Sequence, residues 1–267
     1  MKTVIYYFTG TGNSLGVAKK ITAALGETRL VPVASLVENE GTITPAAERV
    51  GIVCPVYFAG LPLMVASFAE RLRLDGASYV FAVVTFGGSG AVSALGQLDG
   101  ILREHASRGL DSGFSVRMPG NYILMYESPK GAKCAAMLAA ADEKIAQITG
   151  AIRECQRQKL PRSLVEQLVH TVGYGWFIKN ARDKDRTFTV SDTCTSCGTC
   201  AAVCPAGNIT LVEEKPIFSH HCEVCCACIH ACPVQAIQAG SQTGNRQRYR
   251  NPNVTLADLK IPKTETP

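Results

Sequence analysis

The chain has 267 residues, of which 46% are hydrophobic and 18% are charged, and its formal net charge is +5. This length is typical of two domains with enough apolar residues for a buried core. No stretch approaches the about 20 apolar residues that a membrane-spanning helix needs, and no concentrated basic run indicates a nucleic-acid-binding face. We therefore expect neither a membrane nor a nucleic acid as a partner. The short apolar run Thr3–Phe8 leads directly into a glycine-rich loop, unlike a signal peptide, so we expect a cytoplasmic protein.

Residues 1–159 alternate between strand and helix patterns. Short apolar runs predict strands at Thr3–Phe8, Thr28–Val33, Val50–Cys54, Tyr79–Thr85 and Gly113–Arg117. Apolar residues at helical spacing predict helices at Asn13–Leu25, Leu61–Arg73, Ala91–Ser107 and from about Ala132 onward. This alternation predicts an α/β fold with a doubly wound parallel sheet, and five strands favour the flavodoxin-like order.

The loop after the first strand, Thr9-Gly10-Thr11-Gly12-Asn13-Ser14, stands directly before a helix. Converging N–H groups and the helix dipole attract anions there, and glycines let the backbone close around a phosphate. The side chains of Thr9, Thr11, Asn13 and Ser14 add further donors. The P-loop lysine is absent, and the spacing from Gly10 to Gly16 is one residue longer than a dinucleotide-binding loop requires. The loop therefore predicts a site for a terminal phosphate such as that of FMN.

Two more loops follow strands at the same edge of the sheet, where ligands of such folds bind. One contains Pro55, Val56, Tyr57, Phe58, Ala59 and Gly60, and the other contains Thr85, Phe86, Gly87, Gly88 and Ser89. The aromatic residues of the first could stack on a flat ring, and the Gly60 peptide could turn toward it. The small residues of the second would let the backbone approach the ring edge. Met118–Tyr122 follows the fifth strand and is expected to close over the cofactor.

Residues 160–186 are expected to form a helical linker, with Leu164, Leu168 and Val172 at helical spacing. The simpler interpretation is a helix that packs at the interface between two domains. A second interpretation places Trp176 or Phe177 between two redox centres.

Residues 187–240 contain two copies of the run C-x2-C-x2-C-x3-C-P, at Cys194–Pro205 and Cys222–Pro233. This is the bacterial spacing for [4Fe–4S] clusters, in which the fourth cysteine of each run ligates the other cluster. The rule predicts two clusters, one held by Cys194, Cys197, Cys200 and Cys232 and the other by Cys222, Cys225, Cys228 and Cys204. Disulfides fit less well, because they need an oxidising compartment. Zinc also fits less well, because its sites do not need two four-cysteine runs that each end in Cys-Pro.

The other cysteines have no place in this ligand count. Cys226 stands where the first copy has Gly198 and is expected to be structural or spare. Cys54, Cys134 and Cys155 lie among apolar residues and are expected to be buried. The tail, residues 241–267, is expected to be solvated or docked. Contact of its Arg246, Arg248 and Arg250 with an acidic partner or a phosphate is the alternative.

Together these motifs resemble a known family. Thr9–Ser14 resembles the T-x-T-G-x-T phosphate loop of flavodoxins, and the cysteine runs resemble bacterial ferredoxins with two [4Fe–4S] clusters. The combination resembles the flavodoxin–ferredoxin fusion proteins of anaerobic bacteria and archaea over nearly the whole chain. The resemblance implies FMN bound near Thr9–Ser14, Tyr57–Gly60 and Thr85–Ser89, and a small α+β domain for the clusters.

The leading functional hypothesis is an electron-transfer iron–sulfur flavoprotein that relays electrons between two clusters and FMN, and on to a redox partner. That partner would be a ferredoxin, a reductase or an acceptor enzyme. The alternative is an FMN-dependent oxidoreductase that reduces a small molecule, with Tyr57, Tyr122 or Tyr126 as the proton donor. A redox sensor is the third hypothesis, although no output module is evident. We assign no catalytic residue from the sequence.

Overall fold

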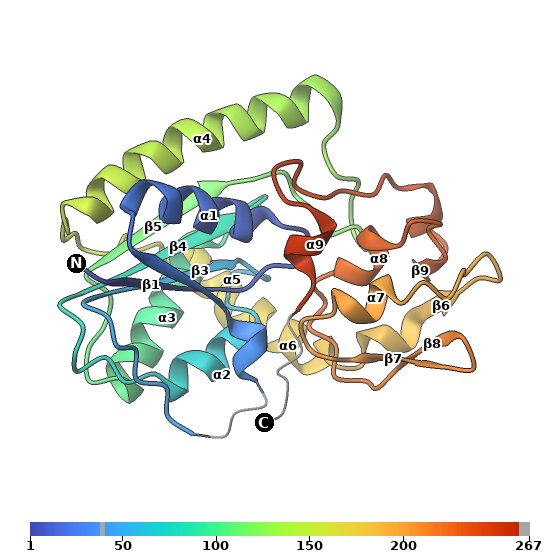
Figure 1. The fold of residues 1–267 in the computed structure, drawn as a ribbon, viewed down its shortest axis with the longest axis horizontal. Coiled ribbons are helices and arrows are strands. Elements are labelled where there is room, and N and C mark those ends of the chain that lie inside the picture. The colour runs from blue at the N-terminus through green and yellow to red at the C-terminus, as the bar shows by residue number, and fades with distance from the viewer. Residues whose placement is uncertain (38–40, 262–267) are drawn as a thin grey trace.

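The computed structural model describes residues 1–37 and 41–261 (Figure 1). Five parallel strands form its central sheet: β1 (Thr3–Tyr7), β2 (Thr28–Pro32), β3 (Arg49–Pro55), β4 (Tyr79–Phe86) and β5 (Ser112–Arg117). Their order is β2-β1-β3-β4-β5. This is the flavodoxin-like order, so the predicted fold class is confirmed.

Helices cover both faces of the sheet (Figure 1). One face carries α1 (Asn13–Leu25) and α4 (Gly131–Arg153), and the other carries α2 (Leu63–Arg71) and α3 (Ala91–His105). Alternate strand residues therefore enter different cores: Ile5 packs with α1 and α4, whereas Val4 packs with α2 and α3. A short 3-10 turn, η1 (Val33–Leu36), follows β2.

The cysteines outside the two runs differ in burial. Cys54 on β3 is fully buried, as expected, and burial raises the pKa of its thiol to about 12. Cys134 and Cys155 are only partly buried, so the expectation of buried thiols is wrong for these two. Both lie at the ends of α4, where fewer neighbours cover them.

The linker is helical, as α5 (Leu164–Val169), a π-helical turn η2 (His170–Tyr174), α6 (Gly175–Ala181) and a 3-10 turn η3 (Lys184–Thr187). Only one side of it packs against the rest of the chain, where Phe177 and Ala181 are buried. Leu164, Leu168 and Val172 are exposed, so the residues that predicted the helix do not form its packed face. Trp176 is also exposed, which contradicts its placement between two redox centres.

The C-terminal region is a small α+β unit (Figure 1). Its elements are β6 (Phe188–Val190), α7 (Thr199–Ala202), β7 (Ile209–Val212), β8 (Lys215–Phe218), α8 (Ala227–Ala231) and β9 (Ile237–Ala239). β6 pairs with β9 and β7 with β8, both antiparallel. Two cysteine-rich loops lead into α7 and α8.

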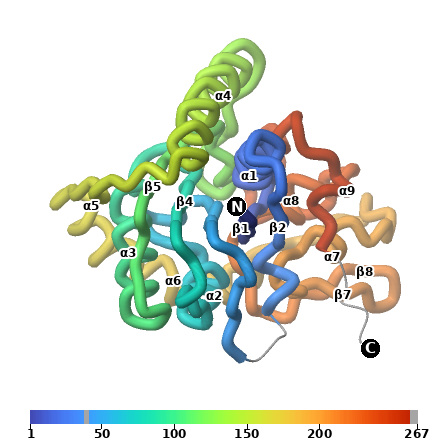
Figure 2. Tube along the Cα trace, turned by 60° about the vertical axis from the view of Figure 1, so that its left-hand side comes forward, coloured from blue at the N-terminus to red at the C-terminus, as the bar shows by residue number. Residues whose placement is uncertain are grey.

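The tail returns from this unit to the sheet domain through η4 (Thr243–Asn245) and α9 (Leu256–Leu259). In Figures 1 and 2, α9 lies beside α1. An ion pair of 2.5 Å between Lys19 and Asp258 joins the two helices and holds the pKa of Asp258 down to about 2. In the described ranges, no helix has both the length and the apolar character needed to cross a membrane.

Candidate functional site

The loop Thr9–Ser14 forms the turn between β1 and α1. Gly12 has a φ of 96°, in the left-handed region that favours glycine. Its N–H donates to Thr9 Oγ1 at 3.1 Å, and Thr11 Oγ1 accepts from Asn121 Nδ2 at 2.5 Å. As acceptors in these bonds, Thr9 and Thr11 keep their own hydroxyl hydrogens for a ligand. Ser14 Oγ lies 2.8 Å from Thr85 Oγ1, which links the first and third predicted loops.

The Asn13 side chain lines the pocket and also connects the loop to distant segments of the chain. Its Nδ2 donates to the Pro119 carbonyl at 3.0 Å. Its Oδ1 accepts from the Tyr249 hydroxyl at 2.7 Å and from Asn251 Nδ2 at 3.2 Å. Asn13 thus connects the loop to the tail through Oδ1, and its Nδ2 keeps a second hydrogen that could donate to a ligand.

The second loop forms a tight turn. Tyr57 N–H donates to Gly60 O at 2.8 Å, and Gly60 N–H donates to Tyr57 O at 2.9 Å. Phe58 and Ala59 between them have φ values of 46° and 63°. Left-handed residues with side chains cost energy and concentrate at ligand sites. Gly60 is not left-handed; a Cβ there would lie 2.3 Å from the Tyr174 ring, so close packing on the linker explains this glycine.

The aromatic side chains of this loop pack against aromatic rings of other segments. Phe58 stacks on Phe177 with ring centroids 4.5 Å apart, and the Tyr122 ring meets Phe58 edge-on at 6.2 Å. Tyr57 packs edge-on against Phe177 at 6.3 Å. Phe177, which belongs to the linker, thus lies in the wall of the candidate ring site, whereas its neighbour Trp176 does not.

The three loops enclose one pocket of about 550 Å³ at the carboxyl edge of the sheet, within the usual size range of cofactor sites. Of the 17 residues predicted to bind the cofactor, only Gly12 and Gly60 do not line it. Met118–Tyr122 lines it as well. Phe177, one of the two residues that a linker interpretation placed between redox centres, also lines the pocket. Residues of other segments that no motif predicted contribute to the lining as well: Arg117, Lys133, Met137, Val169, Val224, Cys225 and Cys226. The alternation pattern gave no signal for them, because they reach the pocket only through the tertiary fold.

The eight cysteines of the two runs separate into two groups of four. Cys194, Cys197, Cys200 and Cys232 line one small cavity, and Cys204, Cys222, Cys225 and Cys228 line another. These are the crossed sets that the ferredoxin rule predicts. Within the described residues, no three His, Cys, Asp or Glu side chains converge closely enough to hold a single metal ion. Thiols that surround a volume suit a cubane cluster better than one ion.

The surroundings of the thiols fit bound iron. Burial raises the pKa of Cys225 and Cys228 well above the usual value, so these thiols need a cation before they ionise. Backbone N–H groups already point at three sulfurs: Asn208 at Cys204, Val224 at Cys222 and Ala236 at Cys232. Such bonds stabilise thiolate ligands and tune their potential.

Cys226 occupies the left-handed backbone position that precedes α8. It precedes α8 with a φ of 59°, as Gly198 precedes α7 with a φ of 70°. It lines the second cysteine cavity and the cofactor pocket together.

The cofactor pocket and the second cysteine cavity adjoin directly. Cys225 lines both. Glu223 of the same cysteine loop is anchored to the sheet domain, since Met64 N–H at the start of α2 donates to its Oε2 at 3.3 Å. Burial raises the pKa of Glu223 to about 7.

Residues 189–210 match the Fer4 family, described as a 4Fe-4S binding domain. The chain joins a flavodoxin-like domain to a 4Fe-4S binding domain. No curated protein sequence matches the chain.

Solved structures are similar to the flavodoxin-like domain only distantly. Oxidised Flavodoxin 2 from Bacillus cereus is 16% identical, with 58% of this chain and 99% of that chain covered and a TM-score of 0.40. An FMN-dependent NADH-azoreductase from Bacillus anthracis, in complex with FMN, is 10% identical with the same coverages and TM-score. Rubredoxin oxygen:oxidoreductase from Desulfovibrio gigas is 16% identical over 57% of this chain and 36% of that chain, with a TM-score of 0.34.

The tail holds the flavodoxin-like and 4Fe-4S binding domains together. His230 on α8 accepts from Tyr249 N–H at Nδ1 (3.0 Å) and therefore donates from Nε2 to the Asn121 carbonyl at 2.8 Å. Burial lowers the pKa of His230 to about 4, which favours this neutral form. Arg246 and Arg248 donate to the carbonyls of Ile123 and Thr243, so two of the three tail arginines serve contacts within the chain.

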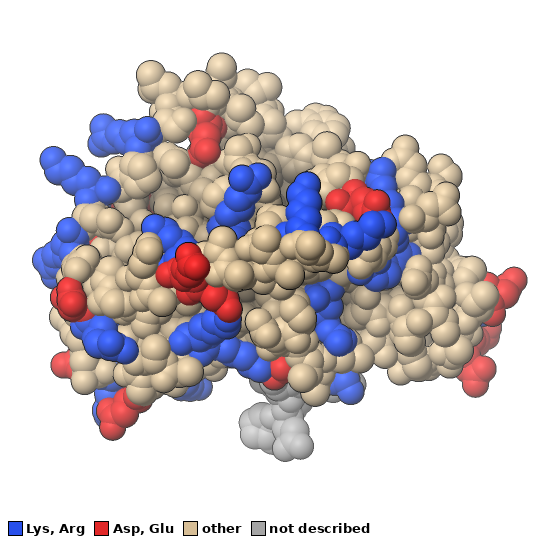
Figure 3. Space-filling model, turned by 90° about the horizontal axis from the view of Figure 1, so that it is seen from above, with Lys and Arg blue, Asp and Glu red and all other residues tan. Residues whose placement is uncertain are grey.

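Charge is distributed unevenly between the two domains. Ser191–Gln238 contains four acidic residues and one lysine, against a net charge of +5 for the whole chain. In Figure 3, seen from above, a group of acidic side chains without Lys or Arg lies at the right-hand edge, while acidic and basic side chains are interspersed over the left half. The 4Fe-4S binding domain lies on the right in Figure 1, and the turn about the horizontal axis keeps it on the right in Figure 3.

Proposed function

We propose that this chain is an iron–sulfur flavoprotein that relays electrons between two [4Fe–4S] clusters and FMN, and on to a redox protein partner. Bound clusters supply one-electron transfer, and bound FMN supplies one- or two-electron transfer. The observation that supports the relay most strongly is the position of Cys225, which lines both the second cysteine cavity and the cofactor pocket. A predicted cluster ligand thus also lines the candidate FMN site.

The residues of the pocket suit FMN in several ways. The Thr9–Ser14 backbone and the free hydroxyl hydrogens of Thr9 and Thr11 would hold its phosphate. Arg117 and Lys133 add positive charge to the lining. Tyr57, Phe58 and Tyr122 offer apolar faces to a planar ring and exclude water from it.

Direct reduction of a small molecule has less support. The tyrosines considered as proton donors all have a raised pKa, chiefly because burial disfavours the phenolate. A phenol with a raised pKa is a poorer acid for proton transfer near neutral pH. The raised pKa values therefore count against these three tyrosines as proton donors.

Cofactor analysis followed by an anaerobic reductive titration tests the proposal. We expect about eight irons and one FMN per chain, and about four electrons taken up, one for each cluster and two for the flavin. Protein that contains zinc without iron, or that retains no flavin after reconstitution, would overturn it. A turnover rate with a small-molecule oxidant well above that of free FMN would favour the reductase instead.

A further inference from the structure

The linker presents an uninterrupted apolar face to solvent. Five large side chains on the run Leu164–Trp176 have exposed fractions from 67 to 84%: Leu164, Val165, Leu168, Val172 and Trp176. Contiguous exposed apolar surface of this kind is uncommon on a soluble domain and marks an interaction site. We call these five residues the linker face.

The opposite side of the same helical run is firmly attached to the flavodoxin-like domain. The Glu166 carboxylate accepts from the N–H groups of Gly90, Val92 and Ser93 at 2.8–3.2 Å. The Tyr174 hydroxyl donates to the Leu61 carbonyl at 2.8 Å. These contacts fix the helix in place, so the exposure of the linker face results from how the helix is mounted on the domain.

Positive charge brackets the linker face. Between Leu164 and Ile178, Glu166 is the only acidic residue and there is no lysine or arginine. Residues 157–186 nevertheless contain seven Lys and Arg against three Asp and Glu, a formal +4 out of the chain's +5. Exposed cations stand before the helix at Arg157, Lys159 and Arg162 and after it at Lys179 and Arg182.

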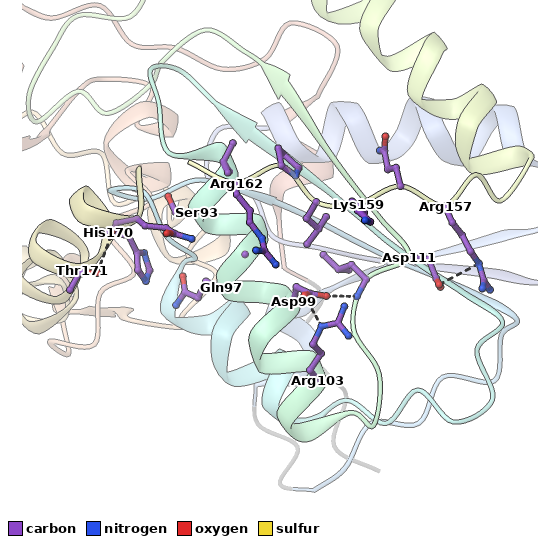
Figure 4. Close-up of a pocket in the computed structure, with 17 residues that line it drawn as sticks. Ser93, Gln97, Asp99, Arg103, Asp111, Arg157, Lys159, Arg162, His170 and Thr171 are labelled. Atoms are coloured by element: carbon purple, nitrogen blue, oxygen red, sulfur yellow. Dashed lines mark hydrogen bonds and ion pairs between the residues drawn. The ribbon is translucent and has the colours of Figure 1, made fainter. Parts of the chain in front are cut away.

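A second cavity adjoins the N-terminal end of the linker face (Figure 4). It has a volume of about 1240 Å³ and lies between α3, the segment that follows α4, and the first turns of the linker. Arg103 and Arg157 are paired there with Asp99 and Asp111 at 2.7 and 3.5 Å. Lys159 and Arg162 form no hydrogen bond or ion pair with residues 1–37 or 41–261. These two cations are therefore available to an anion from outside the chain.

We propose that the linker lies in the plane of an anionic lipid bilayer surface, with the linker face in the acyl boundary and Lys159 and Arg162 at headgroup phosphates. An apolar arc with a tryptophan, bounded by lysines and arginines, is the pattern of interfacial helices. This inference departs from the expectation of no membrane partner, which rested on the absence of a spanning stretch. It does not depend on the relay.

A second copy of the chain fits the linker face less well. In an antiparallel pair, the cations before the helix in one copy would meet those after it in the other, and in a parallel pair like ends would meet. Both arrangements place like charges together. The linker also stands at the edge of the molecule as a projecting element in Figure 2, where α5 is labelled. A projecting apolar ridge suits a deformable lipid surface.

Vesicle flotation with the complete holoprotein tests this inference. Trp176 is the only tryptophan of the chain, so its emission reports directly on the linker face. We expect flotation and a blue shift with vesicles that contain phosphatidylglycerol, and neither with pure phosphatidylcholine vesicles. Absence of flotation on the anionic vesicles would overturn the proposal. A blue shift that depends on protein concentration without vesicles would overturn it in favour of a second copy.

Matched variants separate the two parts of the surface. Leu168→Gln with Val172→Gln should lower the vesicle partition coefficient at least about tenfold, because both side chains would leave the acyl boundary. The control pair Val212→Gln and Ile217→Gln changes side chains on the β7–β8 hairpin that are about half exposed and should have no effect. Lys159→Gln with Arg162→Gln should reduce binding to anionic vesicles, whereas Lys144→Gln on α4 should not. Equal losses in test and control variants would contradict the assigned surface.

Discussion

The backbone of Gly10 lies directly against the main-chain carbonyl of Cys225. A Cβ at position 10 would lie 2.3 Å from that oxygen, closer than any real contact permits. The candidate phosphate loop and the second cysteine loop, more than 200 residues apart in sequence, therefore pack with no room for a methyl group between them. Only glycine allows this approach, and it makes the two candidate cofactor sites structural neighbours.

Gly10→Ala should consequently disturb both sites together. Relief of the clash requires the backbone at Cys225 or Gly10 to move, at a cost of about 1–3 kcal/mol in the free energy of unfolding. We expect iron and flavin content to fall in parallel, as measured by metal analysis and flavin absorbance. Gly100→Ala on α3 is the control, because no atom lies within 4 Å of its added Cβ among the described residues. Loss of flavin with full retention of iron would contradict the shared packing.

Tyr249→Phe should weaken the attachment of the tail. The change removes the 2.7 Å hydrogen bond to Asn13 and leaves the buried Oδ1 with one donor, from Asn251. We expect a loss of about 1 kcal/mol in the free energy of unfolding, measured in urea. Tyr7→Phe serves as the comparison, since the Tyr7 hydroxyl forms no hydrogen bond with the described residues. An equal effect of both variants would count against the Asn13 contact.

Single cysteine variants should reveal the crossed arrangement of ligands. Cys232→Ser should remove the same cluster as Cys194→Ser, because both thiols line one cavity. Cys204→Ser should instead act like Cys222→Ser. Electron paramagnetic resonance of the reduced protein distinguishes the two losses. Cys226→Ser is the control and should keep about eight irons. The interpretation fails if Cys232→Ser and Cys222→Ser remove the same cluster.

Removal of iron should unfold the 4Fe-4S binding domain selectively. Its strands and helices are short, and seven of the eight thiols around the two cavities are buried or partly buried. Metal binding is thus expected to supply much of its folding free energy. After chelation, hydrogen exchange should show lost protection at residues 188–239 and retained protection in β3 and β4. Unchanged protection in both regions would contradict this coupling.

Local patterns in the sequence predicted the sheet domain closely. The apolar spacing placed α1 at Asn13–Leu25, the bounds observed, and the strand predictions differ from the structure by one residue at most. Fully buried parallel strands and amphipathic helices have strong periodic signals, which explains this success. The spacing of the cysteines likewise anticipated which thiols share a cavity.

Contacts between residues far apart in the chain could not be predicted from local sequence patterns. Asn13 reads as a phosphate donor in its own loop, yet Tyr249 and Asn251 occupy its carbonyl oxygen from the tail. Leu168 fits a buried helical stripe, yet the packed face of the linker is set by Glu166 and Tyr174. In each case a polar contact from another part of the chain decides the orientation, and periodicity carries no information on it.

The most direct test of the relay is the kinetics of electron transfer within the holoprotein, starting from oxidised clusters and oxidised flavin. Less than one electron per chain is injected into the clusters by flash photolysis, and the cluster and flavin absorbances are followed together. We expect cluster reoxidation and flavin reduction at one shared first-order rate that does not change with protein concentration. Flavin reduction that occurs only by collision, at a rate proportional to protein concentration, would contradict a relay built into the chain.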